Sequence, residues 1–162
     1  MRPLVARISL DALAHNLRVA RALAGPAKIL SVVKANAYGH GLTRAVRALG
    51  QTDGYAVLSV DEAANLRQMG VEQPILLLEG PFQPGEMAEI ANLGLTPVLH
   101  TPQQIDWLAM SPRPLEVFLK FNSGMNRLGF PLTDFEAVLA KVKSNPAVAG
   151  VTLMTHFATA DE

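Results

Sequence analysis

Short runs of apolar, often β-branched residues alternate along the chain with segments whose apolar positions repeat at helical spacing. The apolar runs predict six strands, at residues 29–33, 55–58, 75–78, 96–99, 116–121 and 150–156. Several of these runs are apolar at consecutive positions, which is typical of strands covered on both faces in a parallel sheet. Residues 4–10 alternate apolar and polar positions like a further strand, which we expect to pair outside the main sheet.

The segments between these strands carry signals for the starts and ends of helices. Apolar residues from position 42 to 49 recur at i, i+3, i+4 and i+7, as on one face of a helix. Residues 101–102, Thr-Pro, predict a helix start, since a capping side chain precedes a proline at the first helical position. Thr133 and Glu136 have the spacing of a capping box. Glycines are expected to end three of the helices: Gly50, Gly70 and Gly94.

Repeated β–α units predict an α/β fold with a parallel sheet, either a doubly wound open sheet or a (β/α)8 TIM barrel. The number of strands does not choose between the two, because six are visible and a closed barrel takes about 250 residues. The last residues, 159–162, follow the sixth predicted strand without a helix to cover it. We therefore expect an architecture that is cut off before its end.

Composition narrows the function classes. The chain has 162 residues, 49% of them hydrophobic, and its 14 basic residues balance 14 acidic ones. A neutral balance without charge runs predicts no affinity for nucleic acid or an anionic membrane surface. Without cysteine, no disulfide framework and no thiolate metal site are expected, and we expect no metal. Arg7 and Asp11 interrupt the start too early for a signal peptide, so a soluble, cytoplasmic protein is expected.

Lys34 directly follows a strongly apolar predicted strand, residues 29–33. A lysine there can extend its amine to solvent while its stem stays buried. It can equally serve as a Schiff-base lysine, because an apolar site favours the neutral amine that attacks an aldehyde, and strand ends face the active site of barrel enzymes. The glycine-bracketed turn that follows suits a close approach to a ligand. Position alone leaves both interpretations open.

The string around this lysine, VKANAYGHG at residues 33–41, resembles the cofactor-lysine motif of alanine racemases without a gap. In that family the lysine forms the internal aldimine with pyridoxal 5'-phosphate and exchanges the α-proton of the D-enantiomer. The resemblance therefore implies these roles for Lys34, and it implies that Tyr38 binds the cofactor's phosphate. His40 lies in the motif without an assigned role.

A second string, FLKFNSGMNRLGF at residues 118–130, is similar to the family's second signature. A lone arginine after a strand is usually a solvated residue, but the resemblance implies that Arg127 contacts the cofactor's phenolic oxygen and the substrate carboxylate. A guanidinium suits both contacts, since it presents several donors at fixed angles. Lys120 matches a lysine that is often carbamylated, a change that would let it orient Arg127. Asn122 stands where many relatives have aspartate, and it keeps the acceptor while losing the charge.

A third string, THFA at residues 155–158, closes the last predicted strand. By itself such a histidine is more often a hydrogen-bonded structural residue, yet the resemblance places His156 beside the cofactor, where it helps to set the opposite catalytic base. His15 is expected on a helix surface and His100 at a strand end. Residues 7–16 and the turn at residues 59–63 are also similar to the family.

The resemblance implies an incomplete TIM barrel of the alanine racemase type, with about six of eight β/α units in residues 1–162 and the C-terminal β domain absent. It implies interconversion of L-alanine and D-alanine, which supplies D-alanine for peptidoglycan, in a homodimer with a shared active site. The second base, a tyrosine of the partner's C-terminal domain, is not expected in this chain, so these residues alone should be inactive.

Other classes stay open beside the racemase. One is a single-domain pyridoxal-phosphate-binding homeostasis protein, although that family's lysine motif lacks the continuation at residues 36–41. Decarboxylases of basic amino acids share only the first three residues from Lys34. The last is a non-catalytic, truncated association module.

Overall fold

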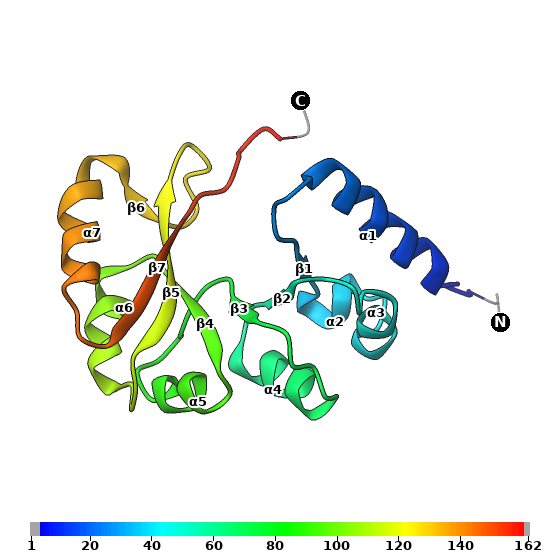
Figure 1. Ribbon diagram of the computed structural model, residues 1–162, viewed down its shortest axis with the longest axis horizontal. Coiled ribbons are helices and arrows are strands. Elements are labelled where there is room, and N and C mark those ends of the chain that lie inside the picture. Colours follow the sequence, from blue (N-terminus) through cyan, green and yellow to red (C-terminus); the bar gives the residue numbers. More distant parts are fainter. Residues whose placement is uncertain (1–3, 161–162) are drawn as a thin grey trace.

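The computed structural model describes residues 4–160 and contains one parallel sheet with helices along its outer side (Figure 1). The strands are β1 (Leu30–Val32), β2 (Gly54–Val57), β3 (Ile75–Leu77), β4 (Leu95–Leu99), β5 (Leu115–Asn122), β6 (Phe130–Pro131) and β7 (Val148–Met154). The helices are α1 (Leu10–Ala24), α2 (Lys34–Tyr38), α3 (Leu42–Ala48), α4 (Val60–Gln68), α5 (Glu86–Asn92), α6 (Pro102–Trp107) and α7 (Phe135–Lys143), with 3₁₀ turns at Leu108–Met110 and Leu132–Asp134. None of the helices within this part of the chain is long and apolar enough to cross a membrane.

All strand pairs are parallel, in the order β1-β2-β3-β4-β5, with the short β6 and the longer β7 both paired to β5. The strands lie along an arc, with α2 to α7 outside it (Figure 1). Within residues 4–160, β1 and β7 each pair with a strand on one side only. The predicted α/β fold is thereby confirmed, and a curved parallel sheet with helices outside it is consistent with an incomplete TIM barrel.

Side chains alternate between two apolar layers along the strands. Tyr55 and Val57 of β2 belong to the larger core between the sheet and the helices, whereas Ala56 between them belongs to a smaller cluster on the inner face. The period of two follows from strand geometry. The inner cluster contains Ala56, Leu76 and Val98, with Leu30, Leu78, Phe118 and Met154 packed against it.

The predicted helix boundaries are confirmed where the signal is local. Thr101 accepts a hydrogen bond from the Gln104 N–H, with Pro102 as the first helical residue of α6. Gly70 and Gly94 follow α4 and α5 with φ of 80° and 61°, the left-handed region that glycine adopts without strain. Gly50 follows the end of α3 as expected, although its φ is not positive.

Two expectations are wrong. Residues 4–9 form no strand, because no segment of the described chain pairs with them, and Leu4 is 97% exposed. Their last residue, Ser9, instead caps α1 through a hydrogen bond from the Ala12 N–H. Thr133 does not cap α7, because residues 132–134 form a 3₁₀ turn first and the Thr133 hydroxyl bonds to Asp134.

The six predicted strands are present with small shifts at their ends. The last one begins at Val148 and ends at Met154, so it lies two residues earlier than expected. A seventh strand was not foreseen: β6 has two residues that pair with the end of β5. Two residues are too few to produce a recognisable pattern.

Candidate active site

Two lysines lie on the inner face at the carboxyl ends of the strands. Lys120 of β5 is two residues beyond Phe118, which packs against the inner cluster, so it shares that face. Lys34 directly follows Val33, which is buried in the outer core. Its half-buried side chain lies on the side of Lys120, since its charge acts on that lysine. The carboxyl edge of a barrel is where active sites lie.

The backbone after Lys34 turns in the left-handed sense. Residues 35–38 have φ between 52° and 55°, and Gly39 follows with φ 82°. For residues other than glycine this conformation costs roughly 1–2 kcal/mol each, so the surrounding structure must hold it in place. The glycine-bracketed turn expected here is thus a strained one, and strain of this kind concentrates at functional sites.

Tyr38 lies on the same side of this turn as Lys34. The Lys34 Nζ is 6.0 Å from the centroid of the Tyr38 ring, within reach of a cation–π contact. Tyr38 is 60% exposed, so the residue is accessible to a ligand. The structure therefore brings together the amine and the phenol that the sequence singles out.

Lys120 is only 6% exposed. Burial lowers the pKa of Lys120, the positive charges of Arg127 and Lys34 lower it further, and the Glu79 carboxylate acts in the opposite direction. Arg127 and Lys34 therefore each lie close enough to Lys120 to act on its charge, although the three come from separate segments of the chain. A lowered pKa increases the share of neutral amine on Lys120.

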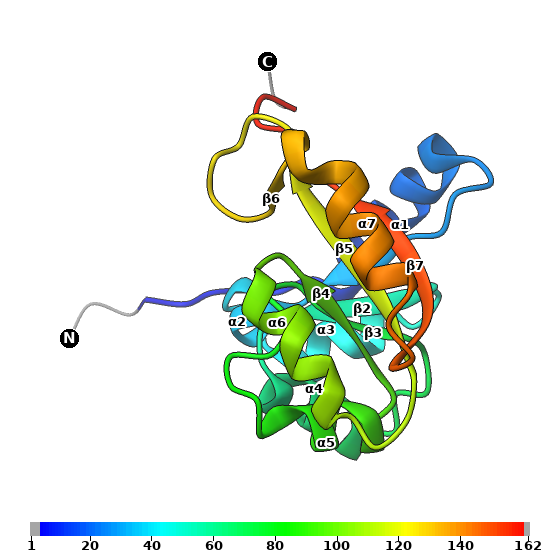
Figure 2. The same ribbon diagram turned by 90° about the vertical axis from the view of Figure 1, so that its left-hand side faces the viewer.

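Arg127 lies on the loop between β5 and β6, which extends past the strand ends (Figure 2). Asn122 folds the start of this loop, because its Oδ1 accepts from the N–H groups of Gly124 and Asn126, both at 3.0 Å. Its Nδ2 also donates to Asn126 Oδ1 at 2.8 Å, which an aspartate could not do. The exposed Arg127 lines a cavity of about 370 Å³ with His100.

The end of the same loop is packed against the backbone of β5. Gly129 has φ +118°, and a Cβ atom there would lie 2.8 Å from the Asn122 N and from the Phe121 carbonyl carbon. Only glycine allows this approach. The loop that carries Arg127 is therefore fixed at both ends.

His156 follows β7 and is exposed. Its neighbour Thr155 donates a hydrogen bond to the Phe121 O at 3.1 Å and also bonds to Ser123. The backbone before His156 is thereby tied to the end of β5, at the same edge as Lys120. Within residues 4–160 the His156 side chain makes no hydrogen bond, so its predicted place beside a cofactor stays a prediction.

Comparison with known proteins shows the family of the chain. The family model for the N-terminal domain of alanine racemase matches residues 8–162. The chain belongs to this family.

Relatives of known name cover the whole chain. It is 63% identical to an alanine racemase from Thiobacillus denitrificans over 100% of its length, and it spans 45% of that protein. The biosynthetic alanine racemase of Pseudomonas aeruginosa, a crystal structure, has a TM-score of 0.92 and 42% identity over 99% of this chain and 46% of its own. A histidine racemase from Leuconostoc mesenteroides is also similar, with a TM-score of 0.76 and 30% identity over 94% of this chain and 42% of its own. The chain thus spans about half the length of the relatives it matches.

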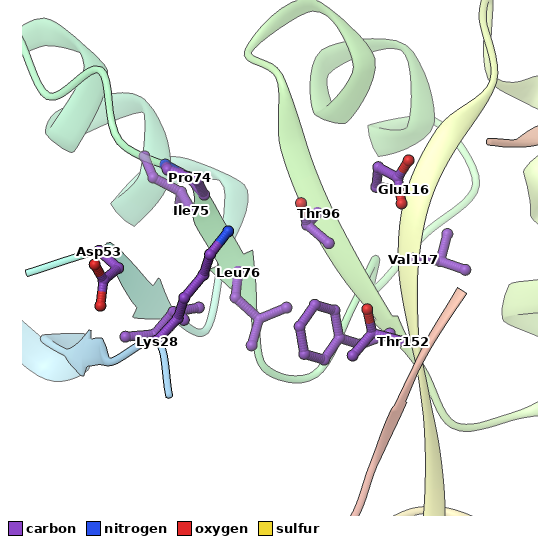
Figure 3. Close-up of a pocket in the computed structure, with 11 residues that line it drawn as sticks. Lys28, Asp53, Pro74, Ile75, Leu76, Thr96, Glu116, Val117 and Thr152 are labelled. Carbon is purple, nitrogen blue, oxygen red and sulfur yellow. The ribbon is translucent and has the colours of Figure 1, made fainter. Parts of the chain in front are cut away.

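Another cavity of this racemase-family chain, of about 750 Å³, is at the opposite ends of the strands (Figure 3). Its floor contains inner-face residues such as Leu76 and Phe118, and Lys28, Asp53 and Glu116 also line it. Asp53 accepts a hydrogen bond from the Ile29 N–H at 2.6 Å and pairs with Arg21, and both interactions lower the pKa of Asp53. Because barrel chemistry lies at the carboxyl ends, we assign this cavity no catalytic role.

Three residues at the carboxyl edge were missed by the sequence analysis. Glu79 contributes charge beside Lys120. Asn36 holds the left-handed turn, since its Oδ1 accepts from the Leu42 N–H at 2.7 Å. Glu62 binds the same turn from the first turn of α4. For Glu62 a signal existed, because Ser59 and Glu62 have the spacing of a capping box.

Proposed function

We propose that this chain is the cofactor-lysine part of an alanine racemase that interconverts L-alanine and D-alanine with pyridoxal 5'-phosphate held covalently by Lys34. The observation that carries the proposal is the meeting of Lys34, Tyr38 and Lys120 at one edge of the sheet, with Arg127 close to Lys120. The donors fit the cofactor: a half-buried amine for its aldehyde, a phenol for its phosphate and a guanidinium for its phenolic oxygen.

When bound, the cofactor delocalises the negative charge that develops on the substrate's α-carbon. Lys34 Nζ takes or returns the α-proton on one face of the substrate. Arg127 binds the substrate carboxylate through two N–H groups of its fork, which fixes the α-carbon relative to the amine. Tyr38 donates its hydroxyl to the phosphate. His156 helps to set the base on the opposite face.

The opposite base is a tyrosine of the partner subunit's C-terminal domain in this proposal. The sequence contains two tyrosines, and neither can take that role. Tyr38 lies on the side of Lys34, and the buried Tyr55 donates its hydroxyl to the carbonyls of Val46 and Leu49 on the outer side of the sheet. We propose that residues 1–162 are the N-terminal part of the barrel domain and are inactive by themselves.

Lys120 is carbamylated in this proposal. The ammonium first loses one proton to solvent, and the neutral amine then attacks the carbon of carbon dioxide. The new N–C bond forms as one C–O π bond breaks, and a second proton leaves to solvent, so a cation becomes an anion. The anion then attracts the Arg127 guanidinium instead of repelling it. The lowered pKa of Lys120 supports this reaction. A crystal structure with a plain ammonium at Lys120 would remove carbamylation and leave the role of Arg127 intact.

The test uses the protein in the form in which its source organism expresses it, and two lysine variants of that protein. Lys34→Ala should lose the visible absorbance of the lysine-bound cofactor and essentially all alanine racemisation, measured by chiral chromatography. Lys28→Ala, in the cavity at the other end of the strands, is the matched control and should keep both. Near-normal racemisation in Lys34→Ala would overturn the assignment. Cofactor absorbance without racemisation in the unaltered protein would favour a cofactor-handling protein.

A racemase of a larger amino acid is the second candidate, favoured by the likeness to the histidine racemase. The same assay with histidine in place of alanine separates the two. We further propose that the enzyme supplies D-alanine for peptidoglycan and works as a cytoplasmic homodimer, as the family resemblance implies.

A further inference from the structure

The left-handed turn after Lys34 cannot satisfy its first N–H group by itself. Inside the turn, the Ala37 N–H donates to the Val33 O at 2.9 Å and the Gly39 N–H to the Ala35 O at 3.2 Å. The Ala35 N–H, directly after Lys34, has no acceptor within the turn. Its acceptor is the Glu62 Oε1 at 2.7 Å, 27 residues away in the chain.

Glu62 stands at the usual position of a capping-box glutamate but binds an unusual partner. It is the third residue of α4, and its own N–H donates to the Ser59 hydroxyl at 3.3 Å. A glutamate there ordinarily accepts from the N–H of the capping residue. Here Glu62 Oε2 accepts at 2.9 Å from Leu58, one residue earlier, which leaves Oε1 for Ala35.

One carboxylate therefore joins the carboxyl ends of two neighbouring strands, because Leu58 follows β2 and Ala35 lies just beyond β1. Hydrogen bonds from N–H groups to a carboxylate are short and strong. Only a carboxylate offers an acceptor to both N–H groups, since an amide would present its NH₂ to one of them.

We propose that Glu62 is a positioning residue for Lys34: it holds the strained turn closed through the Ala35 N–H and so fixes the direction in which the lysine amine leaves the sheet. This inference rests on the proposed function for its catalytic meaning. The clamp itself is a property of the backbone and can be measured without any cofactor.

The first experiment measures amide hydrogen exchange of residues 34–41 by mass spectrometry in the naturally expressed protein, free of cofactor. Glu62→Gln should speed exchange in this segment by about tenfold or more, the loss expected for one charge-assisted hydrogen bond. Asp61→Asn is the matched control. It removes the same charge from the same turn of α4, and Asp61 is exposed. Equal exchange in the two variants would overturn the clamp.

The second experiment reads the lysine's chemistry. In Glu62→Gln the rate of cofactor attachment should fall about tenfold, as for the loss of one charge-assisted hydrogen bond. The primary deuterium isotope effect should rise more with α-deuterated D-alanine than with α-deuterated L-alanine, since Lys34 exchanges the α-proton of the D-enantiomer in the proposed function. An isotope effect that rises equally for both enantiomers would indicate a general structural role and would contradict the proposal. If Glu62→Gln does not fold, Glu62→Asp keeps the charge and shortens the reach towards Ala35, with the same outcomes expected.

Failure of this inference differs from failure of the proposed function. If Lys34→Ala keeps the cofactor absorbance, the proposed function fails, while faster exchange in Glu62→Gln still supports the clamp. If Lys34 carries the cofactor but residues 34–41 exchange alike in Glu62→Gln, Asp61→Asn and the unaltered protein, the clamp fails and the function stands.

Discussion

Gly129→Ala tests how the loop that carries Arg127 is held. At Gly129 the chain returns against β5, and an added Cβ would lie 2.8 Å from two backbone atoms and 3.2 Å from the Lys120 O. Backbone atoms of a paired strand cannot move aside as a flexible side chain can. The loop must shift instead, and Arg127 shifts with it.

A second glycine in the same loop separates the two sources of cost. Gly124 has φ +131° and nothing within 4 Å of its added Cβ, whereas Gly129 has φ +118° and the contacts above. Gly124→Ala should cost only the backbone strain, about 1–3 kcal/mol. Gly129→Ala should cost that strain and a further ~1–3 kcal/mol from overpacking. A difference of ~1.4 kcal/mol corresponds to a tenfold change in an equilibrium constant.

The assay compares the two variants by urea unfolding, followed by circular dichroism, and by the rate of trypsin cleavage after Arg127. Gly129→Ala should unfold at lower urea, be cleaved faster and lose more kcat/KM than Gly124→Ala. Equal unfolding midpoints and equal cleavage rates would refute the reasoning that the close approach to β5 fixes the loop.

Three other predictions concern the charges of the site and the edges of the sheet. Arg127→Lys keeps the positive charge but loses the fork, so kcat/KM for alanine should fall at least about tenfold; unchanged kinetics would contradict its role. Lys120→Met removes an amine whose pKa is lowered by burial. Below that lowered pKa the folded protein has to bury the charged ammonium, which costs stability. In carbon dioxide-free buffer at neutral pH the variant should therefore unfold at higher urea concentration than the unaltered protein. That gain should shrink as the pH rises towards 10.5, the ordinary lysine value, and a pH-independent gain would contradict the cause. A polypeptide of these 162 residues, expressed alone, should associate through the open edges of β1 and β7, bind pyridoxal phosphate weakly and show no racemisation. A cooperatively melting monomer in sedimentation and circular dichroism would contradict association through the open edges. Measurable racemisation would contradict the claim that these residues lack the second base.

Features that depend on neighbouring residues in the chain could be predicted from the sequence. Thr101 and Pro102 start α6, and Gly70 and Gly94 end two helices, because capping depends on residues a few positions apart. The six longer strands could be predicted because each is a run of mostly apolar residues that are adjacent in the chain. Lys34, Tyr38 and Lys120 came from motifs, and the structure brings them to one edge of the sheet.

Features that depend on a distant partner could not be predicted. Residues 4–9 have a strand pattern, but a strand also requires a neighbour, and the described chain offers none. Nothing local predicts left-handed Ala35 or Ala37, since alanine favours the right-handed helix. The roles of Glu62 and Glu79 likewise arise only when the strands are placed side by side.

The left-handed turn has a consequence for anyone who transfers this lysine loop to another protein. The string from Val33 to Gly41 does not satisfy all of its own N–H groups, because the acceptor for Ala35 lies 27 residues downstream on a different helix. Grafted onto the end of a foreign strand, the same nine letters should relax into an ordinary right-handed turn and aim the amine elsewhere. A sequence search or an enzyme design should therefore require the loop together with a glutamate at that separation, because only then does it select for the left-handed conformation of the loop.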